Sequence, residues 1–512
     1  MVGAALAHLP EYLSAHVLLS MSAIALGFAI SLPLAVAVSR LPGWRAISLG
    51  VAGVIQTIPG LALLALFYPL LLGLSAFTER SFGFGIAALG FLPAMLALTL
   101  YSILPVLRNT LTALAETDPA ILMAARAVGM TPWQSLWKVE LPLAAPFVMA
   151  GLRTASVWVI GTATLSTPVG QTSLGNYIFT GLQTENWVFV LFGCVAAAVL
   201  ALVVDRLLAL AETGIALRSR PRLVAAAAGL LVAIGASLAP LFAGAGQRPV
   251  VIGTKSFEEQ YILGALIDDR LKSAGFPSMR RDGLGSTVIF RALEVGDVDV
   301  YVDYSGTLWA NEMRRADMPG RQAVLNRLSS WLAKRGVKDI GPLGFENAYA
   351  FAMRADRAKA LRVESLGDLA AYAPRLKIGG DFEIFSRPEW RAVVDAYGLR
   401  FAKQRQYQAN FMYKALVDGD VDVITAFSSD GRIAQYGLKL LSDPKHALPP
   451  YDAVLLVSAR YADDGRFLAA LRPLIGAIDL AQMQRANLMV DAQQNKKTPE
   501  EAAHWLERQA VH

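Results

Sequence analysis

Two aromatic residues stand at the same place in two copies of one sequence pattern. Residues 291–305 read RALEVGDVDVYVDYS and residues 414–428 read KALVDGDVDVITAFS, at a constant offset of 123. Tyr304 and Phe427 occupy matching positions near the ends of these copies, and each is followed by a serine. Aromatic faces can hold apolar or cationic ligands, although aromatic side chains also commonly fill protein cores.

The repeated pattern predicts a helix end, a glycine-aspartate turn and a short strand that finishes at the aromatic residue. A weaker echo joins residues 251–253 to residues 377–379. Two similar α/β units predict the two lobes of one clamshell. Because ligands of open α/β sheets bind beyond the carboxyl ends of the strands, we expect Tyr304 and Phe427 to face one cleft from opposite lobes.

Charge divides the chain sharply near residue 247. Residues 1–247 carry 11 Lys+Arg and 8 Asp+Glu, whereas the remaining 265 residues carry 36 and 33. This shift predicts a membrane domain over residues 1–215, a sixth span with a linker over 216–247, and a soluble two-lobed domain over 248–512.

Several classes of function find no support in the composition. The net charge of +6 is small for 512 residues, and no basic run indicates nucleic-acid binding. The single cysteine, Cys194, cannot form a disulfide within the chain, and the five histidines have no metal-ligand spacing. No nucleophile–base pair is visible, so we expect neither a metal, a cofactor nor an enzyme activity.

Six apolar segments of the first half are long enough to cross a bilayer, which needs about 20 residues. We predict spans at residues 16–38, 46–73, 84–107, 143–167, 187–205 and 223–243. With the N-terminus outside, ten of the eleven basic residues of this half fall inside, and only Arg80 falls outside. This orientation places residues 248–512 on the periplasmic or extracellular side.

The last predicted span resembles a secretory signal peptide. Residues 218–247 begin with Arg218, Arg220 and Arg222, continue without a charge, and close on small residues. The charge distribution instead predicts a sixth span that stays uncleaved and tethers the soluble domain to the membrane.

The long inner loop before the fourth span predicts two short helices. Asp118-Pro119 fits an N-cap and first helical position, Gly129 a break, and Leu141-Pro142 the end of the second helix. The loop resembles the coupling loop of ABC importer permeases, which docks on an ATP-hydrolysing subunit. Met123 departs from the usual glutamate. The matching residues are Ala124, Ala125, Gly129, Leu141 and Pro142.

Two polar patches, at residues 56–60 and 161–168, fall within predicted spans. They could line a translocation path, or they could serve helix packing through Ser and Thr hydrogen bonds. Similar segments occur in permeases for quaternary-amine osmoprotectants.

Six stretches of the soluble half carry recognisable motifs: residues 253–260, 303–307, 347–349, 385–388, 427–431 and 449–451. In these stretches the soluble half resembles the binding proteins of ABC importers for glycine betaine, choline and carnitine. The resemblance implies an aromatic cage for a trimethylammonium group, which aromatic faces attract by about 0.5–2 kcal/mol per ring. Its members would be Tyr304, Tyr349, Phe427 and Tyr451.

The same resemblance implies polar contacts for the rest of the ligand. Arg387 would hold a carboxylate with its forked guanidinium, and Lys255, Thr307 and Asn347 would add further contacts. Phe427 stands where the family commonly has tyrosine, which keeps the ring and removes one hydrogen bond. Glycine betaine is therefore not favoured over ergothioneine, a trimethylated ligand imported by relatives of this fused architecture.

Together these features and resemblances imply a helical membrane domain of the ABC importer type I kind, followed by a two-lobed α/β domain of the periplasmic-binding-protein type II clamshell kind. The chain would be the permease and binding subunit of a quaternary-amine importer in the bacterial inner membrane, surrounded by lipid. It lacks a G-x-x-x-x-G-K-[ST] motif, so two copies of a separate ATPase would serve a homodimer of this chain. A ligand-gated receptor without an ATPase is the rival from another class.

Overall fold

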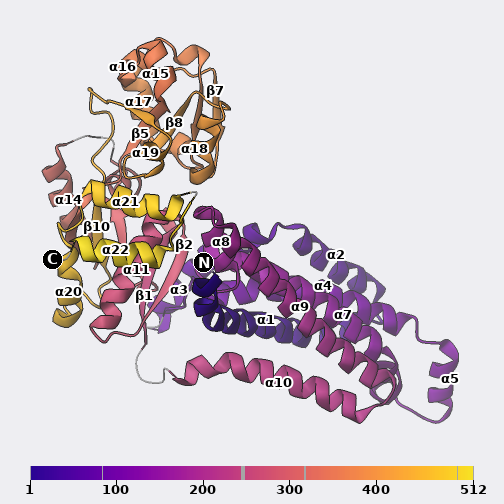
Figure 1. The fold of residues 1–512 in the computed structure, drawn as a ribbon. Coiled ribbons are helices and arrows are strands. Elements are labelled where there is room, and N and C mark those ends of the chain that lie inside the picture. The colour runs from indigo at the N-terminus through magenta and orange to yellow at the C-terminus, as the bar shows by residue number, and fades with distance from the viewer. Residues whose placement is uncertain are drawn as a thin grey trace. The chain divides into compact units, whose positions relative to one another are not determined.

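The computed structural model (Figure 1) describes residues 2–82, 85–243, 248–315, 317, 319–492 and 494–510. The chain divides into two compact units: Val2–Phe179 with Val188–Gly246, and Gln247–His512 with Thr180–Trp187. The small-residue linker predicted at residues 244–247 lies outside the described residues.

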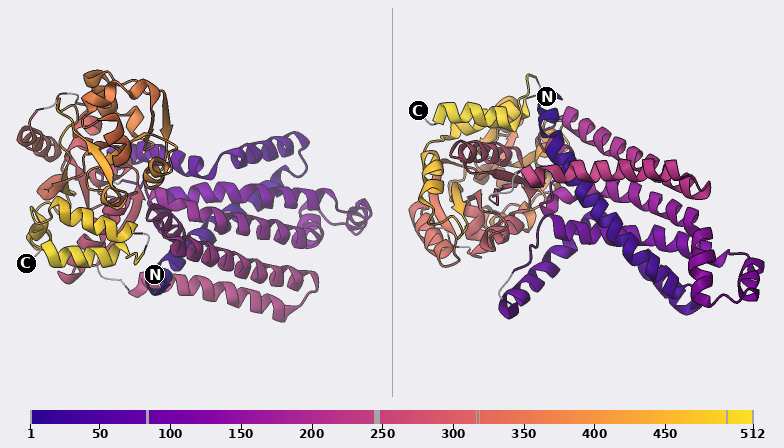
Figure 2. Two further views of the ribbon diagram at one scale, coloured as in Figure 1. Left: turned by 45° about the horizontal axis from the view of Figure 1, so that its top comes forward. Right: turned by 90° about the horizontal axis from the view of Figure 1, so that it is seen from below.

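The first unit is helical throughout its described secondary structure (Figure 2). Six segments are long and apolar enough to cross a membrane, as expected: Val2–Val38, Gly60–Phe82, Phe91–Ala115, Pro132–Val169, Trp187–Ala216 and Arg220–Leu238. The elements are α1 (Val2–Val38), α2 (Pro42–Thr57), α3 (Gly60–Phe82), α4 (Phe91–Ala115), α5 (Pro119–Ala127), α6 (Pro132–Ser135), the π turn η1 (Leu136–Glu140), α7 (Leu141–Ala163), the 3-10 turn η2 (Thr164–Val169), α8 (Gly175–Gln183), α9 (Trp187–Ala216) and α10 (Arg220–Ala243).

The second predicted span, residues 46–73, is wrong because the chain breaks there into α2 and α3. Pro59 disfavours helical geometry at the preceding residue, and Ile58 is extended with ψ of 128°. The hydroxyl of Tyr101 on α4 donates to the Ile58 carbonyl oxygen, which satisfies an acceptor freed by the break. The first polar patch therefore lies at a helix junction and not within a span.

The expected helix end at Leu141-Pro142 is also wrong. Helical backbone continues from α6 through η1 into α7, where Pro142 lies in the first turn. The amide of Leu141 bonds to the carbonyl of Leu136, five residues earlier. This π geometry accommodates Pro142 in a continuous helix, because the backbone hydrogen bonds before it already run to the fifth residue back instead of the fourth.

The helix α4 forms the centre of the membrane unit, packed against α1 and α7 (Figure 2). One charged network joins α7 to α9: Arg153 bonds Asp205 with two nitrogens, at 2.9 and 3.0 Å, and Glu212 with a third at 2.9 Å. These partners explain how an arginine is accommodated in the fourth span.

The second polar patch forms the end of α7 and the turn η2. Ser166 and Thr164 donate their hydroxyls to carbonyls three residues earlier, at 2.6 and 2.7 Å. Thr167 instead donates to the side chain of Asn176, at 3.1 Å. These local bonds satisfy the hydroxyls within the protein, as helix packing requires.

The soluble unit contains two five-stranded sheets with the same topology. Sheet A has the order β2-β1-β3-β10-β4 and sheet B the order β7-β6-β8-β5-β9. In each, only the fourth strand of this order, β10 or β5, runs antiparallel to its neighbours, and the first three strands pair in parallel. The strands are β1 (Val250–Lys255), β2 (Ser278–Leu284), β3 (Val300–Tyr304), β4 (Lys338–Glu346), β5 (Tyr349–Arg354), β6 (Lys377–Gly380), β7 (Lys403–Gln406), β8 (Val423–Phe427), β9 (Leu438–Leu441) and β10 (Asp452–Val457).

The repeated aspartates explain why the sequence pattern recurs. Asp299, before β3, accepts a hydrogen bond from the Val251 amide of β1, and Asp422, before β8, accepts one from the Lys377 amide of β6, both at 2.9 Å. Each carboxylate thus ties the start of one parallel strand to the next. The turn glycines take positive φ: Gly296 at 77° and Gly419 at 81°.

Helices cover both sheets. In sheet A, α11 packs on β1 and against α20, α21 and α22; the last two lie side by side in Figure 1. Thr498 caps α22, since its hydroxyl accepts from the Glu501 amide at 3.2 Å. The helices are α11 (Glu258–Ser273), α12 (Ser286–Glu294), α13 (Ser305–Thr307), the π turn η3 (Leu308–Glu312), α14 (Arg321–Ala333), α15 (Ala355–Leu361), α16 (Leu366–Ala370), η4 (Ala373–Arg375), η5 (Ile384–Ser386), α17 (Pro388–Tyr397), α18 (Ala409–Val417), α19 (Arg432–Gln435), α20 (Gly465–Leu471), η6 (Arg472–Leu474), α21 (Leu480–Asp491) and α22 (Pro499–Ala510).

The chain crosses between the two lobes at two places. Residues 347–348 connect β4 to β5, and residues 442–451 connect β9 to β10. These crossings define a first lobe built on sheet A and a second built on sheet B, which agrees with the predicted clamshell.

Candidate ligand-binding site

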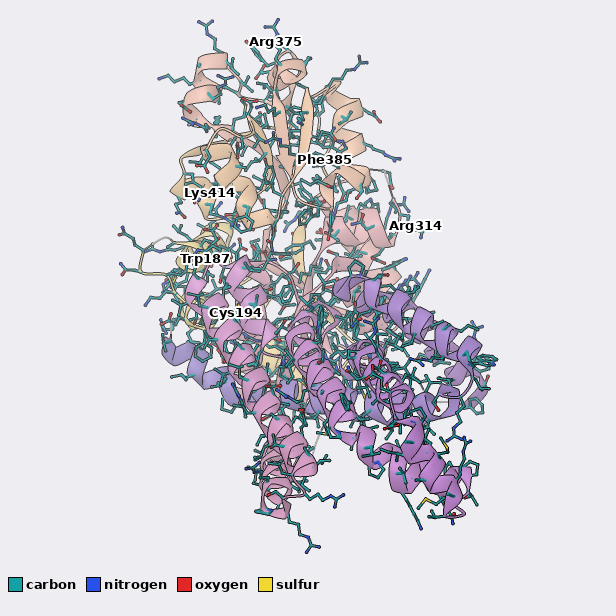
Figure 3. The ribbon with its side chains drawn as sticks, turned by 90° about the vertical axis from the view of Figure 1, so that its right-hand side faces the viewer. Trp187, Cys194, Arg314, Arg375, Phe385 and Lys414 are labelled. Carbon is teal, nitrogen blue, oxygen red and sulfur yellow. The ribbon has the colours of Figure 1, made fainter. Side chains whose placement is uncertain are left out.

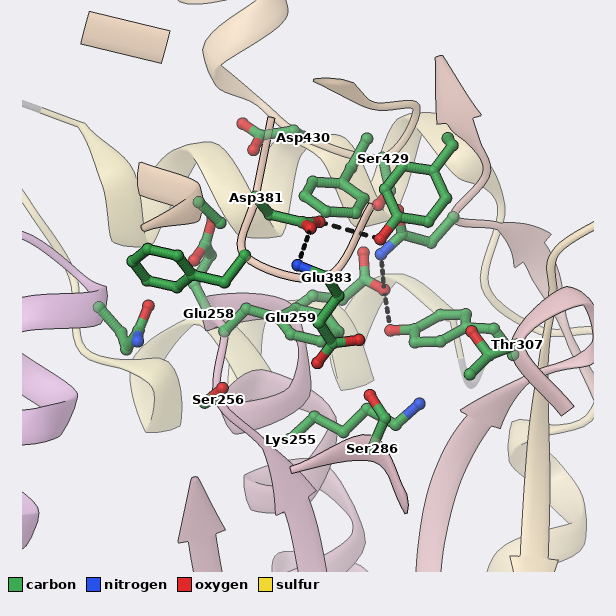
Figure 4. A pocket seen from close by; sticks show the side chains of 18 of the residues that line it. Lys255, Ser256, Glu258, Glu259, Ser286, Thr307, Asp381, Glu383, Ser429 and Asp430 are labelled. Atoms are coloured by element: carbon green, nitrogen blue, oxygen red, sulfur yellow. Dashed lines mark hydrogen bonds between the residues drawn. The ribbon is translucent and has the colours of Figure 1, made fainter. Parts of the chain in front are cut away.

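A cavity in the soluble unit lies where strands of both sheets end (Figure 4). Tyr304 and Phe427, the last residues of β3 and β8, both line it, so the repeat places one ring from each lobe at the cavity. The structure brings all eight predicted site residues to its wall: Lys255, Tyr304, Thr307, Asn347, Tyr349, Arg387, Phe427 and Tyr451.

Five aromatic rings form a continuous series along this wall. Phe257 lies between Tyr304 and Phe427, with centroids 6.1 and 6.5 Å away, and its plane is within 2° of parallel to Phe427. Tyr349 follows at 5.1 Å from Phe427, and Tyr451 at 5.8 Å from Tyr349. The rings come from both lobes and from the second crossing segment, so together they offer the π faces that a quaternary ammonium group needs.

Acidic side chains fix the orientations of the three tyrosine rings. The hydroxyl of Tyr349 donates to Asp381 at 2.9 Å, and that of Tyr451 donates to Glu389 at 2.6 Å. The hydroxyl of Tyr304 donates to Glu259. With the hydroxyls engaged, the rings present their faces rather than their polar ends.

Glu259 connects several parts of the site. Besides Tyr304, its carboxylate accepts from the side-chain amides of Asn347 and Asn487, both at 3.1 Å. Burial raises the pKa of Glu259, while hydrogen bonds from Ser429 and these partners oppose that rise. One carboxylate thus ties together the cage, the first crossing segment, α21 and the loop after β8.

Arg387 is buried at the cavity wall, directly before α17. Its guanidinium lies over the ring of Tyr349, 5.5 Å from the centroid. Its Nε and Nη1 atoms are buried and have no hydrogen-bond partner among the described residues. Two buried donors without acceptors are costly unless a ligand supplies the acceptors, so this side chain fits a carboxylate-binding role.

The other predicted polar residues are differently placed. The ammonium of Lys255 is buried and paired with Asp303, so its charge is already compensated. Asn347 keeps a buried Oδ1 that has no partner among the described residues, and Thr307 contributes to the wall.

A buried ion-pair network borders the cavity. Arg432, on the second lobe, pairs with its neighbour Asp430 and with Glu258 and Asp491 of the first lobe. Burial raises the pKa of Glu258, while the charge of Arg432 opposes this. These three carboxylates lie close enough to hold a metal ion, but the guanidinium already lies among them and takes the place of a cation.

The sequence prediction missed Phe257 and the acidic partners of the cage. Phe257 was part of a matched stretch and lies just beyond β1. Asp381 and Glu383 follow β6, the counterpart of β1 in the other sheet. The weaker sequence similarity between residues 251–253 of β1 and 377–379 of β6 was therefore the signal that could have pointed to Asp381 and Glu383.

The five predicted coupling-loop residues belong to the membrane unit. Ala124 is exposed on α5 and Ala125 is buried, while Gly129 takes a positive φ of 78° after that helix. Leu141 and Pro142 begin α7. The first helix and the glycine turn thus form as predicted, whereas the second helix continues into α7. Large apolar side chains are exposed on this loop: Ile121, Met123, Val128, Trp133 and Trp137.

These features define a two-lobed ligand-binding domain joined to a helical membrane domain. A family model described as the substrate binding domain of ABC-type glycine betaine transport systems matches residues 248–508. A second, described as the inner membrane component of binding-protein-dependent transport systems, matches residues 27–216.

Similar proteins include the ergothioneine transport permease/ergothioneine binding protein EgtU of Helicobacter pylori (strain G27). It is 30% identical over 487 residues, which cover 91% of this chain and 84% of its own. The choline transport system permease protein OpuBB of Bacillus subtilis (strain 168) is 39% identical over 197 residues, covering 38% and 83%. A crystal structure of a glycine betaine/carnitine/choline ABC transporter is 28% identical, covers 51% of this chain and 97% of its own, and has a TM-score of 0.45.

The chain therefore belongs to the family of ABC importer subunits in which a membrane permease and a glycine betaine-type substrate-binding domain share one polypeptide. It is a transport subunit and not an enzyme; such permeases work with a separate ATPase subunit and a small-molecule substrate. The receptor alternative is not favoured, because the relatives are transport proteins.

Proposed function

We propose that the chain imports quaternary amines of the glycine betaine, choline and carnitine class, with energy from a separate ATPase. The observation that carries this proposal is a cavity wall with a continuous series of five aromatic rings and a buried arginine, two of whose nitrogens have no hydrogen-bond partner among the described residues. The rings would hold the trimethylammonium group, and Arg387 would hold a carboxylate.

Ergothioneine is the second candidate ligand. The relative from Helicobacter pylori that is named for it matches this chain across both its membrane and soluble halves. Ergothioneine carries the same ammonium and carboxylate groups, so the cage and Arg387 serve both candidates. Additional polar groups at the wall would contact its heterocycle, such as the Oδ1 of Asn347, which has no partner in the described part of the chain.

Calorimetric titration of the detergent-solubilised chain tests this function. The ligands would be glycine betaine, choline, carnitine and ergothioneine, and the variants Tyr304→Ala and Tyr304→Phe. We expect Tyr304→Ala to weaken binding by roughly tenfold or more, since it removes one ring, and Tyr304→Phe to weaken it less because the π face remains. If no quaternary amine binds, or if Tyr304→Ala changes nothing, the cage is not the binding site.

The proposed assembly contains two copies of this chain and two ATPase subunits. The loop from Ala124 to Pro142 would dock on the ATPase, and its exposed apolar side chains support this role. The placement of basic residues supports an orientation with this loop inside the cell and the binding domain outside. Lobe closure around the ligand, delivery to the channel and ATP-driven inward opening would then follow one another.

The sixth span, α10, would serve as an uncleaved tether between residues 1–215 and 248–512. A short tether keeps the binding domain near the channel at an effective concentration on the order of millimolar. Immunoblots of membrane and soluble fractions test it: the full-length chain should remain in the membrane, whereas a soluble fragment beginning near residue 247 would contradict the tether.

A further inference from the structure

The carboxylate of Glu383 already binds part of the Arg387 guanidinium, the group that a ligand carboxylate would need. The Nη2 atom of Arg387 is paired with the carboxylate of Glu383, one helical turn earlier in the chain. The Glu383 side chain is 51% exposed, whereas that of Arg387 is 8% exposed. The arginine is therefore held in the wall, and its partner has access to solvent.

The rest of the guanidinium remains open. Nε and Nη1 have no hydrogen-bond partner among the described residues. The other nearby carboxylate, Glu389, is 3.6 Å from Nη1, beyond hydrogen-bond distance, and is itself fully buried and bonded to Tyr451. Of these two carboxylates, only that of Glu383 can turn away from Arg387 into water, because the carboxylate of Glu389 is fully buried.

Departure of Glu383 requires only a side-chain rotation. Its backbone amide donates to Asp381 at 2.8 Å, and its carbonyl accepts from the Ser386 hydroxyl at 2.7 Å. These bonds hold the backbone while leaving the side chain free to turn towards water. Both Glu383, labelled in Figure 4, and Arg387 line the ligand cavity and a second cavity that adjoins it at Thr307.

We propose that Glu383 is a specificity-determining residue that competes with the carboxylate of a zwitterionic ligand for Arg387. This inference rests on the proposed function of the cavity. A ligand with a carboxylate must displace Glu383 to use the whole guanidinium. Its binding free energy is then reduced by the loss of the Glu383–Arg387 ion pair. A ligand such as choline, with a hydroxyl in place of the carboxylate, leaves the pair intact. The residue thereby narrows the preference for zwitterions over simple cations.

A different role for the same carboxylate predicts a different result. If Glu383 instead attracted the ammonium group of every ligand, its neutralisation would weaken glycine betaine and choline alike. The two ligands share the trimethylammonium group and differ in the carboxylate, so their affinity ratio separates the two roles.

The test is calorimetric titration of the full-length, detergent-solubilised chain with glycine betaine and with choline. We expect Glu383→Gln to tighten glycine betaine binding by roughly tenfold, equal to about 1.4 kcal/mol, and to leave choline binding unchanged or weaker. Glu383→Ala, which removes the carboxylate altogether, should shift the ratio of glycine betaine affinity to choline affinity in the same direction. Asp395→Asn is the matched control, because it removes the same charge from an exposed position on α17 and should leave the ratio unchanged.

An unchanged ratio in both Glu383 variants, or an equal loss for the two ligands, overturns the inference while the proposed function stands. If the wild-type chain binds neither these two ligands nor carnitine or ergothioneine, the proposed function fails and this inference fails with it. A ratio that shifts equally in the Asp395→Asn chain also overturns it, because net charge would then be the cause.

Discussion

At the scale of single residues, the site combines apolar faces with charges that are already paired. Lys255 is paired with Asp303, and Arg432 lies among three carboxylates. Arg387 is also paired, with Glu383, but two of its nitrogens have no hydrogen-bond acceptor among the described residues, against one nitrogen of Arg432. Charge at the cavity wall is therefore mostly structural, and of the two arginines Arg387 keeps the larger donor capacity for a ligand.

One buried acid outside the cavity gives a prediction about pH. Burial raises the pKa of Asp339, on β4, from 3.8 to about 6, although a hydrogen bond from the Gly341 amide opposes this. The folded chain thus binds this proton more tightly than the unfolded chain does. The ionised carboxylate costs stability progressively as the pH rises from about 4 through 6.

We expect Asp339→Asn to raise the free energy of unfolding of the soluble domain by on the order of 2 kcal/mol at pH 7–8. The difference should shrink steadily as the pH falls through 6 towards 4 and vanish below the unfolded-state pKa of 3.8, where wild-type Asp339 is protonated in both states. Melting curves of the solubilised chain from pH 4 to pH 8 measure it, with Asp395→Asn as the exposed control. Equal stabilisation at pH 4 and pH 8 would refute the assignment to ionisation.

At the scale of elements, the internal repeat stabilises the two sheets as well as placing Tyr304 and Phe427 at the cavity. Asp299 and Asp422 perform the same task in the two sheets, but their surroundings differ. Asp299 is fully buried, whereas the bond from the Lys377 amide to Asp422 is exposed to solvent. Water can replace a lost acceptor at the second place and not at the first.

We therefore expect Asp299→Ala to destabilise the soluble domain by about 1–3 kcal/mol, because the Val251 amide would be left buried and unpaired. Asp422→Ala should cost less, since the Lys377 amide can bond to water. Thermal melting compares the two variants, and amide hydrogen exchange at Val251 reports the local effect. A larger loss for Asp422→Ala would contradict this account of the repeat.

Much of the element order follows from sequence patterns. The repeat located β3 and β8, and the apolar runs predicted six spans. The misplaced boundaries both involve proline: Pro59 divides one predicted span, and Pro142 fails to end a helix. A proline breaks a helix or is accommodated by a shifted ladder according to its tertiary neighbours, such as Tyr101 near Ile58, which local patterns do not contain.

The site was predictable in its aromatic members and less so in its acidic ones. Tyr304 and Phe427 were marked by repetition, and the remaining predicted residues by resemblance. Glu259 and Asp381 act through hydrogen bonds to tyrosine hydroxyls that are far away in the sequence. Each pairing lies within one lobe and joins elements that are separated along the chain, β3 with α11 and β5 with the loop after β6. The contact therefore depends on how each lobe packs, and residue spacing alone does not assign it.

At the scale of the whole molecule, one polypeptide joins a membrane permease to its own binding domain. Each half contains a feature that indicates its function: an aromatic cavity in residues 248–510 and an exposed apolar loop in the membrane unit. Because ATP hydrolysis belongs to a separate subunit, transport requires that this loop, or another surface of the membrane unit, contact that subunit.

Val128 offers a direct test of the loop. It is 73% exposed at the end of α5, directly before the Gly129 turn, and Met123 and Trp133 nearby are 67% and 64% exposed. If the ATPase covers this apolar surface, Val128→Glu places an unpaired charge in the contact, which is strongly unfavourable. We expect ligand affinity of the solubilised chain to stay within about twofold, while ligand uptake by cells falls by roughly tenfold or more.

Val295→Glu is the matched control, since Val295 is 57% exposed in the soluble domain at the end of α12. The two variants make the same substitution at exposed helix ends, so they separate a loss of docking from a general effect of added charge. Uptake of radiolabelled ligand and membrane content by immunoblot should be measured together for both. Normal uptake by the Val128→Glu chain would show that the ATPase docks elsewhere, whereas a loss confined to this variant, with ligand binding intact, places the transmission of ATP energy at the loop between α4 and α7.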